Sequence, residues 1–259
     1  MSDLHAKVKQ WLLGTGFPLE MQAASAFRAA GFEVRQASTY ADPQMDKGRE
    51  IDVLAMDPDF YGFIEISVVV ECKSSSKPWV ALVSEKTLEG YNRVHAMAVS
   101  SSAARSAIVD ALTKDNTRPR PKPLSLPDRC GYGLRQALST EHDPAYTACV
   151  NVLKACASIA RDRVPGGLPR LCIVFPVLAV DAPIFECELI AGNELSLNEV
   201  DSTRILFSAY LPDPISSCIR VVRTKHLPDV AAELKSSADE LRQTLGFRQD
   251  ELVKKWSRS

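Results

Sequence analysis

The sequence lacks the features of membrane proteins, secreted proteins and polycationic coat proteins. No apolar run approaches the roughly 20 residues of a membrane helix. The N-terminal segment, MSDLHAKVKQWLLG, has neither a long apolar stretch nor a small-residue cleavage site, so we expect no signal peptide. The formal net charge is only -1. Any attraction to nucleic acid must therefore come from a local basic patch rather than from the average field.

The cysteines and histidines form no recognisable metal or redox motif. The cysteine count of seven is odd, and no two cysteines have the C-x-x-C spacing of a zinc or redox site. Most of them lie among apolar residues, where a reduced cysteine packs like a small hydrophobe. The four histidines have no ligand spacing either. This usage favours a reducing, cytoplasmic compartment.

The length and composition are those of a globular protein with a sizeable core. The chain has 259 residues, of which 46% are hydrophobic and 24% are charged. This length suits one large α/β domain or two small ones. We favour a single domain over residues 1–259, elaborated by a region of helices and loops at about 80–145. A separate C-terminal β unit is the alternative.

Hydrophobic periodicity and turn residues predict where helices and strands lie. Helices are expected at residues 3–13, 18–30, 145–163 and 228–245. Strands are expected at residues 32–38, 50–56, 64–74, 171–180, 184–190, 204–210 and 219–223. Residues 41–49 read as a polar loop. Three strands followed by a helical crossover indicate a mixed α/β sheet.

The most informative strand is IEISVVVECKS at residues 64–74. Side chains alternate between the faces of a strand, so Glu71 and Lys73 share one face, while Cys72 points to the other face and into the core. A turn at residues 57–63 predicts that this strand pairs antiparallel with the strand at 50–56. On that neighbour, Glu50, Asp52 and Leu54 share a face, so Asp52 is expected to meet Glu71.

This grouping suggests metal-assisted hydrolysis. Two carboxylates about 4 Å apart repel by about 4 kcal/mol at an effective dielectric near 20. Lys73 offsets part of this repulsion, and a divalent cation with a preference for oxygen ligands, Mg²⁺ or Mn²⁺, offsets more. Such an ion lowers the pKa of bound water and stabilises charge on a phosphodiester. Lys73 would then orient the attacking water and favour its hydroxide form.

The order of these residues resembles the PD-(D/E)xK nuclease superfamily, also called restriction-endonuclease-like. The resemblance covers about residues 17–80, and the later helix and strand fit more loosely. It implies an αβββαβ core, here with extra C-terminal strands and a helix, and Mg²⁺-dependent cleavage. It also implies that Asp52 and Glu71 are metal ligands and that Lys73 is the catalytic lysine. Glu20 would be an added ligand or water contact, and the backbone carbonyl of Cys72 would face the metal.

The match departs from the family pattern in one position, and plainer interpretations exist beside it. Ile51, rather than proline, precedes Asp52. Glu71 and Lys73 also suit a solvent-side ion pair, which contributes little to stability. Glu20 stands in a first helical turn, where the helix dipole favours a carboxylate without any catalytic role.

Two further features suit either nucleic-acid contact or a structural role. Trp79 suits stacking on a base or burial under a loop. The proline-rich stretch TKDNTRPRPKPLSLP is expected to be an exposed loop. Its basic residues suit either phosphate binding or a solvated loop; they are Lys114, Arg118, Arg120 and Lys122.

The leading hypothesis is therefore a Mg²⁺-dependent (deoxy)ribonuclease, expected to be an endonuclease acting on DNA in microbial defence, repair or mobile elements. The alternative is a catalytically inactive nuclease-fold protein that binds nucleic acid or a partner protein. No helix-turn-helix, zinc finger or basic zipper stands out. A third hypothesis is therefore a subunit of a larger assembly, either a homo-oligomer or a complex with a partner protein.

Overall fold

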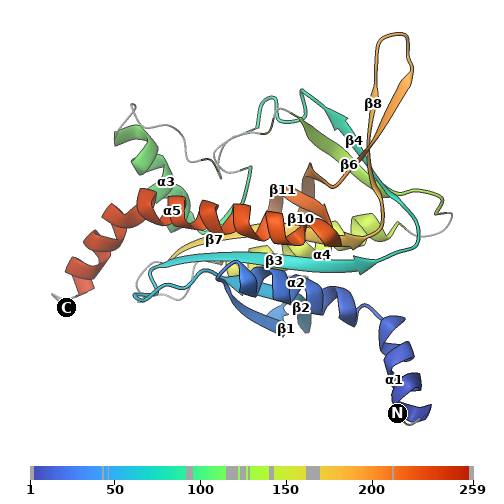
Figure 1. Ribbon diagram of the computed structural model, residues 1–259. Coiled ribbons are helices and arrows are strands. Elements are labelled where there is room, and N and C mark those ends of the chain that lie inside the picture. The colour runs from blue at the N-terminus through green and yellow to red at the C-terminus, as the bar shows by residue number, and fades with distance from the viewer. Residues whose placement is uncertain are drawn as a thin grey trace.

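The protein has a mixed α/β fold in which helices cover both faces of one mixed sheet (Figure 1). The computed structural model describes residues 3–42, 44–45, 47–91, 96–114, 122, 127, 129–139, 143–161, 170–211 and 213–256. The predicted fold class is confirmed at this level. Within these ranges, no helix is both long and apolar enough to cross a membrane.

Along the chain, two runs of strands, β1–β5 and β7–β11, are separated and flanked by helices. The helices are α1 (Asp3–Leu13), α2 (Phe17–Ala29), α3 (Ser102–Lys114), α4 (Pro144–Ile159) and α5 (Leu227–Trp256), with a short 3₁₀ turn η2 (Thr224–His226) before α5. The strands are β1 (Glu33–Ala41), β2 (Gly48–Met56), β3 (Ile64–Ser74), β4 (Trp79–Ser84), β5 (Val99–Ser100), β6 (Cys130–Gln136), β7 (Leu171–Asp181), β8 (Ile184–Leu189), β9 (Leu195–Val200), β10 (Ser202–Leu211) and β11 (Asp213–Arg223).

The predicted elements exist, but several boundaries and the middle of the chain differ. The region 80–145, expected to hold only helices and loops, also contains β4, β5 and β6. β6 has the sequence CGYGLRQ, whose two glycines hide the strand pattern. The expected loop at 41–49 is shorter, because β1 and β2 extend into it. α5 continues through Gly246 to Trp256, since Leu252 near its end is still buried.

The strands form one sheet in the order β1-β2-β3-β7-β11-β10-β6-β4-β8-β9, with β5 beside β7. β1, β2 and β3 form an antiparallel meander, which confirms the predicted pairing of residues 50–56 with residues 64–74. β3 then pairs in parallel with β7 along its whole length, from Ile64–Leu171 to Ser74–Asp181. The chain between β3 and β7 includes α3 and α4, as a parallel connection requires.

β3 separates two hydrophobic cores. On one side, called the α5 face, Ile66, Val68 and Val70 pack with residues of α2, α3 and α5. On the other side, called the α4 face, Val69 packs with residues of α4. Each such buried aliphatic side chain contributes about 1.5–3 kcal/mol relative to exposure. Burial on both faces explains why this strand is a nearly continuous apolar run.

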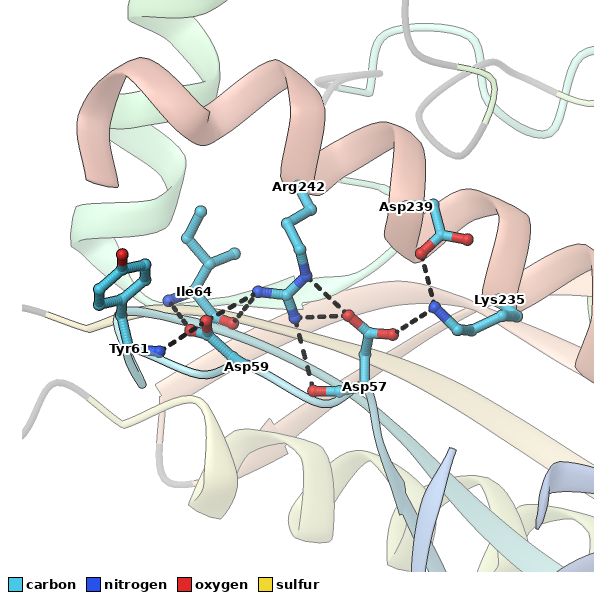
Figure 2. A network of polar contacts seen from close by, with 7 residues as sticks. All are labelled: Asp57, Asp59, Tyr61, Ile64, Lys235, Asp239 and Arg242. Carbon is cyan, nitrogen blue, oxygen red and sulfur yellow. Dashed lines mark hydrogen bonds and ion pairs between the residues drawn. The ribbon is translucent and has the colours of Figure 1, made fainter. Parts of the chain in front are cut away.

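A charged network fastens the β2–β3 turn to α5 (Figure 2). The side chain of Asp57 is 1% exposed and receives hydrogen bonds from Arg242, whose Nε lies 2.8 Å from Oδ2. The Nζ of Lys235 lies 2.8 Å from the other oxygen of Asp57. Asp59 pairs with the same arginine at 3.3 Å and accepts the backbone N–H of Ile64 at 2.9 Å. The network thus holds the start of β3 against α5.

We expect Arg242→Ala to lower the free energy of unfolding by about 3 kcal/mol, because it leaves the Asp57 carboxylate buried with one fewer partner. Urea denaturation measures this loss. The matched control is Arg248→Ala on the same helix, whose ion pair with Glu251 is largely exposed, and which should cost less than about 1 kcal/mol. Equal losses in the two variants would show that the network does not stabilise the fold.

Candidate active site

Asp52 and Glu71 meet just beyond the last residue pair of the β2–β3 ladder. Val53 pairs with Val70, so Asp52 and Glu71 are the next residues in the same register. The carboxylate Oδ2 of Asp52 accepts a hydrogen bond from the backbone N–H of Cys72 at 2.7 Å. The structure therefore brings together the two carboxylates that strand alternation expected to meet.

The strand geometry around Asp52 is irregular. On β1, Gln36 pairs with Val53 and Ser38 pairs with Ile51, but Ala37 and Asp52 between them do not pair. Ala37 has φ 52°, a left-handed conformation that costs a residue with a Cβ about 1 kcal/mol. Strained backbone of this kind is often found at functional sites.

This irregularity corrects the simple alternation expected for β2. Ile51 packs in the core of the α4 face, whereas Val53 packs in the core of the α5 face, although they are two residues apart. Leu54 packs against the α4 face as well. The expectation that Glu50, Asp52 and Leu54 share one face is therefore wrong, because side-chain alternation breaks at Asp52.

Glu71 is held by two side chains. Glu71 as a whole is 8% exposed. Its Oε1 lies 2.8 Å from the Nζ of Lys73 and accepts a hydrogen bond from Nδ2 of Asn151 at 3.3 Å. Asn151 lies on α4 and was missed at the sequence level. In the sequence, the one sign of a role for Asn151 is its polar carboxamide within an otherwise apolar helix, next to Val152, which is buried.

The charges at this site shift one another's pKa. Burial, and then the nearby charge of Glu71, raises the pKa of Asp52 to about 6. Burial opposes the charged form of Lys73, but the attraction of Glu71 outweighs it, so the pKa of Lys73 is raised above its ordinary value. Lys73 is therefore a cation at neutral pH, and Asp52 titrates close to neutrality.

Glu20 lies near this cluster without joining it. It stands in the first turn of α2, and burial together with the charge of Glu50 raises its pKa. The charges of Lys73 and Glu71 also act on it, but no hydrogen bond or ion pair joins it to them. Its Oε1 instead lies 3.7 Å from the position that a Cβ on Gly16 would occupy. The position of Glu20 is thus compatible with a carboxylate that the helix dipole favours in the first turn of α2.

Cys72 contributes its backbone here and packs its side chain elsewhere. The thiol lies against the core of the α5 face, away from Glu71, as strand alternation predicted. Burial, and then the charge of Asp52, raises the pKa of this thiol above its ordinary value. The side chain is therefore a core hydrophobe rather than a thiolate nucleophile.

Asp52 and Glu71 suit a hard divalent cation with a largely aqueous coordination shell. One oxygen of each carboxylate, Oδ1 of Asp52 and Oε2 of Glu71, accepts no hydrogen bond from the residues described. Mg²⁺ is commonly held by one or two carboxylates and keeps several waters. No group of three or more acidic, histidine or cysteine side chains in the described ranges is arranged to hold a metal. A cation held here would therefore have two carboxylate ligands, Asp52 and Glu71, without Glu20 as a third.

A second polar network fixes α4 to the end of the β1–β2 hairpin. The side chain of Asp42 is fully buried and accepts hydrogen bonds from Arg49, from the Nζ of Lys154 at 3.2 Å, and from the backbone N–H of Gln44 at 2.9 Å. Lys154 lies about one turn of α4 beyond Asn151. One helix therefore contacts both Asp42 and Glu71, which fixes the hairpin relative to the site.

The remaining sequence-level candidates lie elsewhere. Trp79 is fully buried on β4, so it is a core residue and does not stack on a base. Arg118 and Arg120 lie outside the described residues, as does the side chain of Lys114. Lys122 lines a cavity beneath α5, remote from the contacts made by Glu71.

We expect the Asp42 network to make stability fall in acid. Burial raises the pKa of Asp42, but hydrogen bonds from Gln44, Lys154 and Arg49 outweigh it and lower the pKa to about 2. The folded pKa is below the unfolded one, so this stabilisation of about 2 kcal/mol is complete above pH 4 and is lost as the pH falls toward 2. Asp42→Asn should remove it. Its deficit in urea denaturation should be full at pH 7 and should shrink between pH 4 and pH 2.

The control for Asp42→Asn is Asp3→Asn, which breaks an exposed ion pair with Lys7. It should change stability by less than about 0.5 kcal/mol at either pH. A deficit of Asp42→Asn that is the same at pH 7 and pH 3 would contradict the electrostatic account.

We expect Asp52→Asn to stabilise the metal-free protein at pH 8. The pKa of Asp52 is raised to about 6, so its ionised form costs folding free energy above that pH. The gain should be at most about 3 kcal/mol and should shrink as the pH falls from 6 toward 4. Thermal denaturation in EDTA measures it, with Glu65→Gln on β3 as the control. A destabilised Asp52→Asn variant would mean that the carboxylate has a structural role.

Comparisons with protein-family models, with curated proteins and with solved structures found no match to this chain. Inferences about activity therefore depend on the geometry of Asp52, Glu71, Lys73 and Asn151.

Proposed function

We propose that this protein is a Mg²⁺- or Mn²⁺-dependent nuclease, an endonuclease acting on DNA, with a restriction-endonuclease-like core. The observation that carries the proposal is the meeting of Asp52 on β2 with Glu71 near the end of β3, with Lys73 paired to Glu71. The proposal is supported by the succession of α2, β1, β2, β3, α4 and β7, with β7 parallel to β3, which is compatible with an αβββαβ core that carries β4, β5, α3 and β6 as an insertion between β3 and α4.

In this proposal Asp52 and Glu71 would hold the cation, which would lower the pKa of a bound water and stabilise charge on the phosphate. Lys73 is protonated, so it donates hydrogen bonds to a phosphate oxygen or to the attacking water and favours hydroxide; it does not act as a base. Asn151 holds the Glu71 carboxylate by its Oε1 and leaves Oε2 available. Glu20 acts through the field it adds to Asp52 rather than as a direct ligand.

A second candidate function is a catalytically inactive nuclease-fold protein that binds nucleic acid or a partner protein. Lys73 and Asn151 both occupy the same oxygen of Glu71, and the described residues hold no three-ligand metal group. An internal ion pair can replace a cation as the compensation for clustered carboxylates. Metal binding separates this candidate from the nuclease.

For the nuclease, incubation of the pure chain with plasmid DNA and with RNA in Mg²⁺ or Mn²⁺ should give cleavage of the DNA. Asp52→Ala and Lys73→Ala should each reduce the rate at least about a hundredfold, the usual contribution of a directly acting group. The matched control is Glu65→Gln. Glu65 lies on β3, as Lys73 does, but its carboxylate pairs with Arg170, far from Asp52. Cleavage that survives both alanine variants would disprove the assignment.

Metal binding distinguishes the two candidates without relying on activity. Calorimetric titration of the wild-type chain with Mn²⁺ should show saturable binding that disappears in Glu71→Ala and persists in Glu65→Gln. No Mn²⁺ binding by a folded wild-type protein would instead favour the inactive binding protein.

A further inference from the structure

A cavity of 290 Å³ lies beneath α5, between this helix and strands β7, β10 and β11. In Figure 1, α5 runs across β10 and β11. The apolar wall of the cavity is formed by Phe175 and Val177 of β7, on the α5 face of the sheet, and by Val230 and Leu234 of the helix. Glu71 contacts α4 on the opposite face. The cavity is therefore separate from the candidate active site, and its volume is close to the lower end for small-molecule sites.

Two arginines lie side by side on the sheet wall of this cavity. Arg204 on β10 and Arg220 on β11 are direct cross-strand partners, and both line the cavity. Like charges placed directly opposite each other on a sheet are destabilising. Burial, and then the positive charge of Arg204, lowers the pKa of Arg220 below its ordinary value. The pair is therefore held together at an electrostatic cost.

One carboxylate serves both arginines. The two oxygens of Glu233 on α5 accept from Arg204 at 2.8 Å and from Arg220 at 3.2 Å. The Nε of Arg220 is buried and has no hydrogen-bond partner among the residues that the structure describes. A guanidinium presents five donors, so this one is far from saturated. Arg223, on the same strand, pairs instead with two carboxylates, Glu199 and Asp201. Among the residues described, it has no buried nitrogen without a hydrogen-bond partner.

The other charged residues of the lining do not cancel the excess positive charge of the two arginines. They are Lys122, whose backbone N–H donates to Glu240 at 3.1 Å, and Glu240 itself. Three basic and two acidic side chains therefore surround the cavity among the residues described. An excess positive charge beside a buried, unused N–H donor favours an anionic ligand, and the guanidinium fork matches the oxygens of a phosphate group.

We propose that this cavity binds a small phosphate monoester, with its phosphate against Arg204 and Arg220 and its apolar body against Phe175 and Leu234. The volume is too small for a polynucleotide strand, so the ligand is a separate small molecule rather than the nuclease substrate. The proposal is independent of the nuclease assignment, because none of the residues involved contacts Asp52 or Glu71.

Titration calorimetry of the full chain with three probes tests the ligand class. Phenyl phosphate carries both the anion and an apolar ring, inorganic phosphate carries only the anion, and phenol carries only the ring. We expect phenyl phosphate to bind at least about tenfold more tightly than either partial probe. Benzoate should bind less tightly than phenyl phosphate, because a carboxylate engages fewer guanidinium donors. Tighter binding of benzoate, or no saturable binding of phenyl phosphate, would overturn the proposal.

Three variants test the location of the site. Arg220→Gln should weaken phenyl phosphate binding about tenfold or more, as expected when a charge-assisted contact is removed. Glu233→Gln should strengthen binding several-fold, because it removes the carboxylate that competes for both arginines. The matched control is Arg223→Gln, which changes an arginine of the same strand outside the cavity and should leave the affinity unchanged.

The first two variants are expected to change the affinity for phenyl phosphate in opposite directions, which keeps the test decisive. Loss of fold in Arg220→Gln would weaken binding for a trivial reason, but it cannot explain a gain in Glu233→Gln. Circular dichroism of each variant confirms that it is folded before titration. An unchanged or weaker affinity in folded Glu233→Gln, or equal losses in Arg220→Gln and Arg223→Gln, would place the anion elsewhere on the surface.

Discussion

The burial of β3 on both of its faces is the constraint on which the rest of the structure depends. Ile66, Val68 and Val70 pack under α2 and α5, and Val69 packs under α4, while β2 and β7 flank the strand on its two edges. A strand enclosed in this way has no freedom to shift its register, because a slip by one residue would exchange its two sets of side chains. Glu71 and Lys73, at its end, are therefore held in defined positions.

The polar residues at the end of β3 are compensated by neighbours rather than by solvent. Asn151 and Lys73 contact the nearly buried Glu71, while Asp52 accepts a backbone N–H and keeps a raised pKa. Unpaired buried charge is costly, so the fold tolerates this carboxylate pair at the expense of stability. The left-handed Ala37 beside Asp52 adds to that cost. Such a balance is typical of a site kept for binding or chemistry.

The two faces of the sheet carry different chemistry within one row of strands. Val177 on β7 lies in register with Arg220 and lines the cavity, whereas Leu178, the next residue, lies in register with Glu71. One face therefore presents Glu71, and the other presents Arg220. Alternation along β7 separates the carboxylate pair from the anion cavity by the thickness of the sheet, so a ligand on either face leaves the other accessible.

Local sequence was enough to predict β3, its antiparallel partner and the proximity of Asp52 to Glu71, because the turn between the two strands sets which residues lie opposite each other. It also determined that Cys72 points into the core. Only the tertiary structure decided the contact of Asn151 with Glu71, the broken alternation at Asp52 and the position of Arg204 beside Arg220. These depend on which distant segments pack together, and periodicity carries no information about such long-range pairing. The position of Glu20 was decided in the same way, by how α2 docks on the sheet rather than by its place in a helical turn.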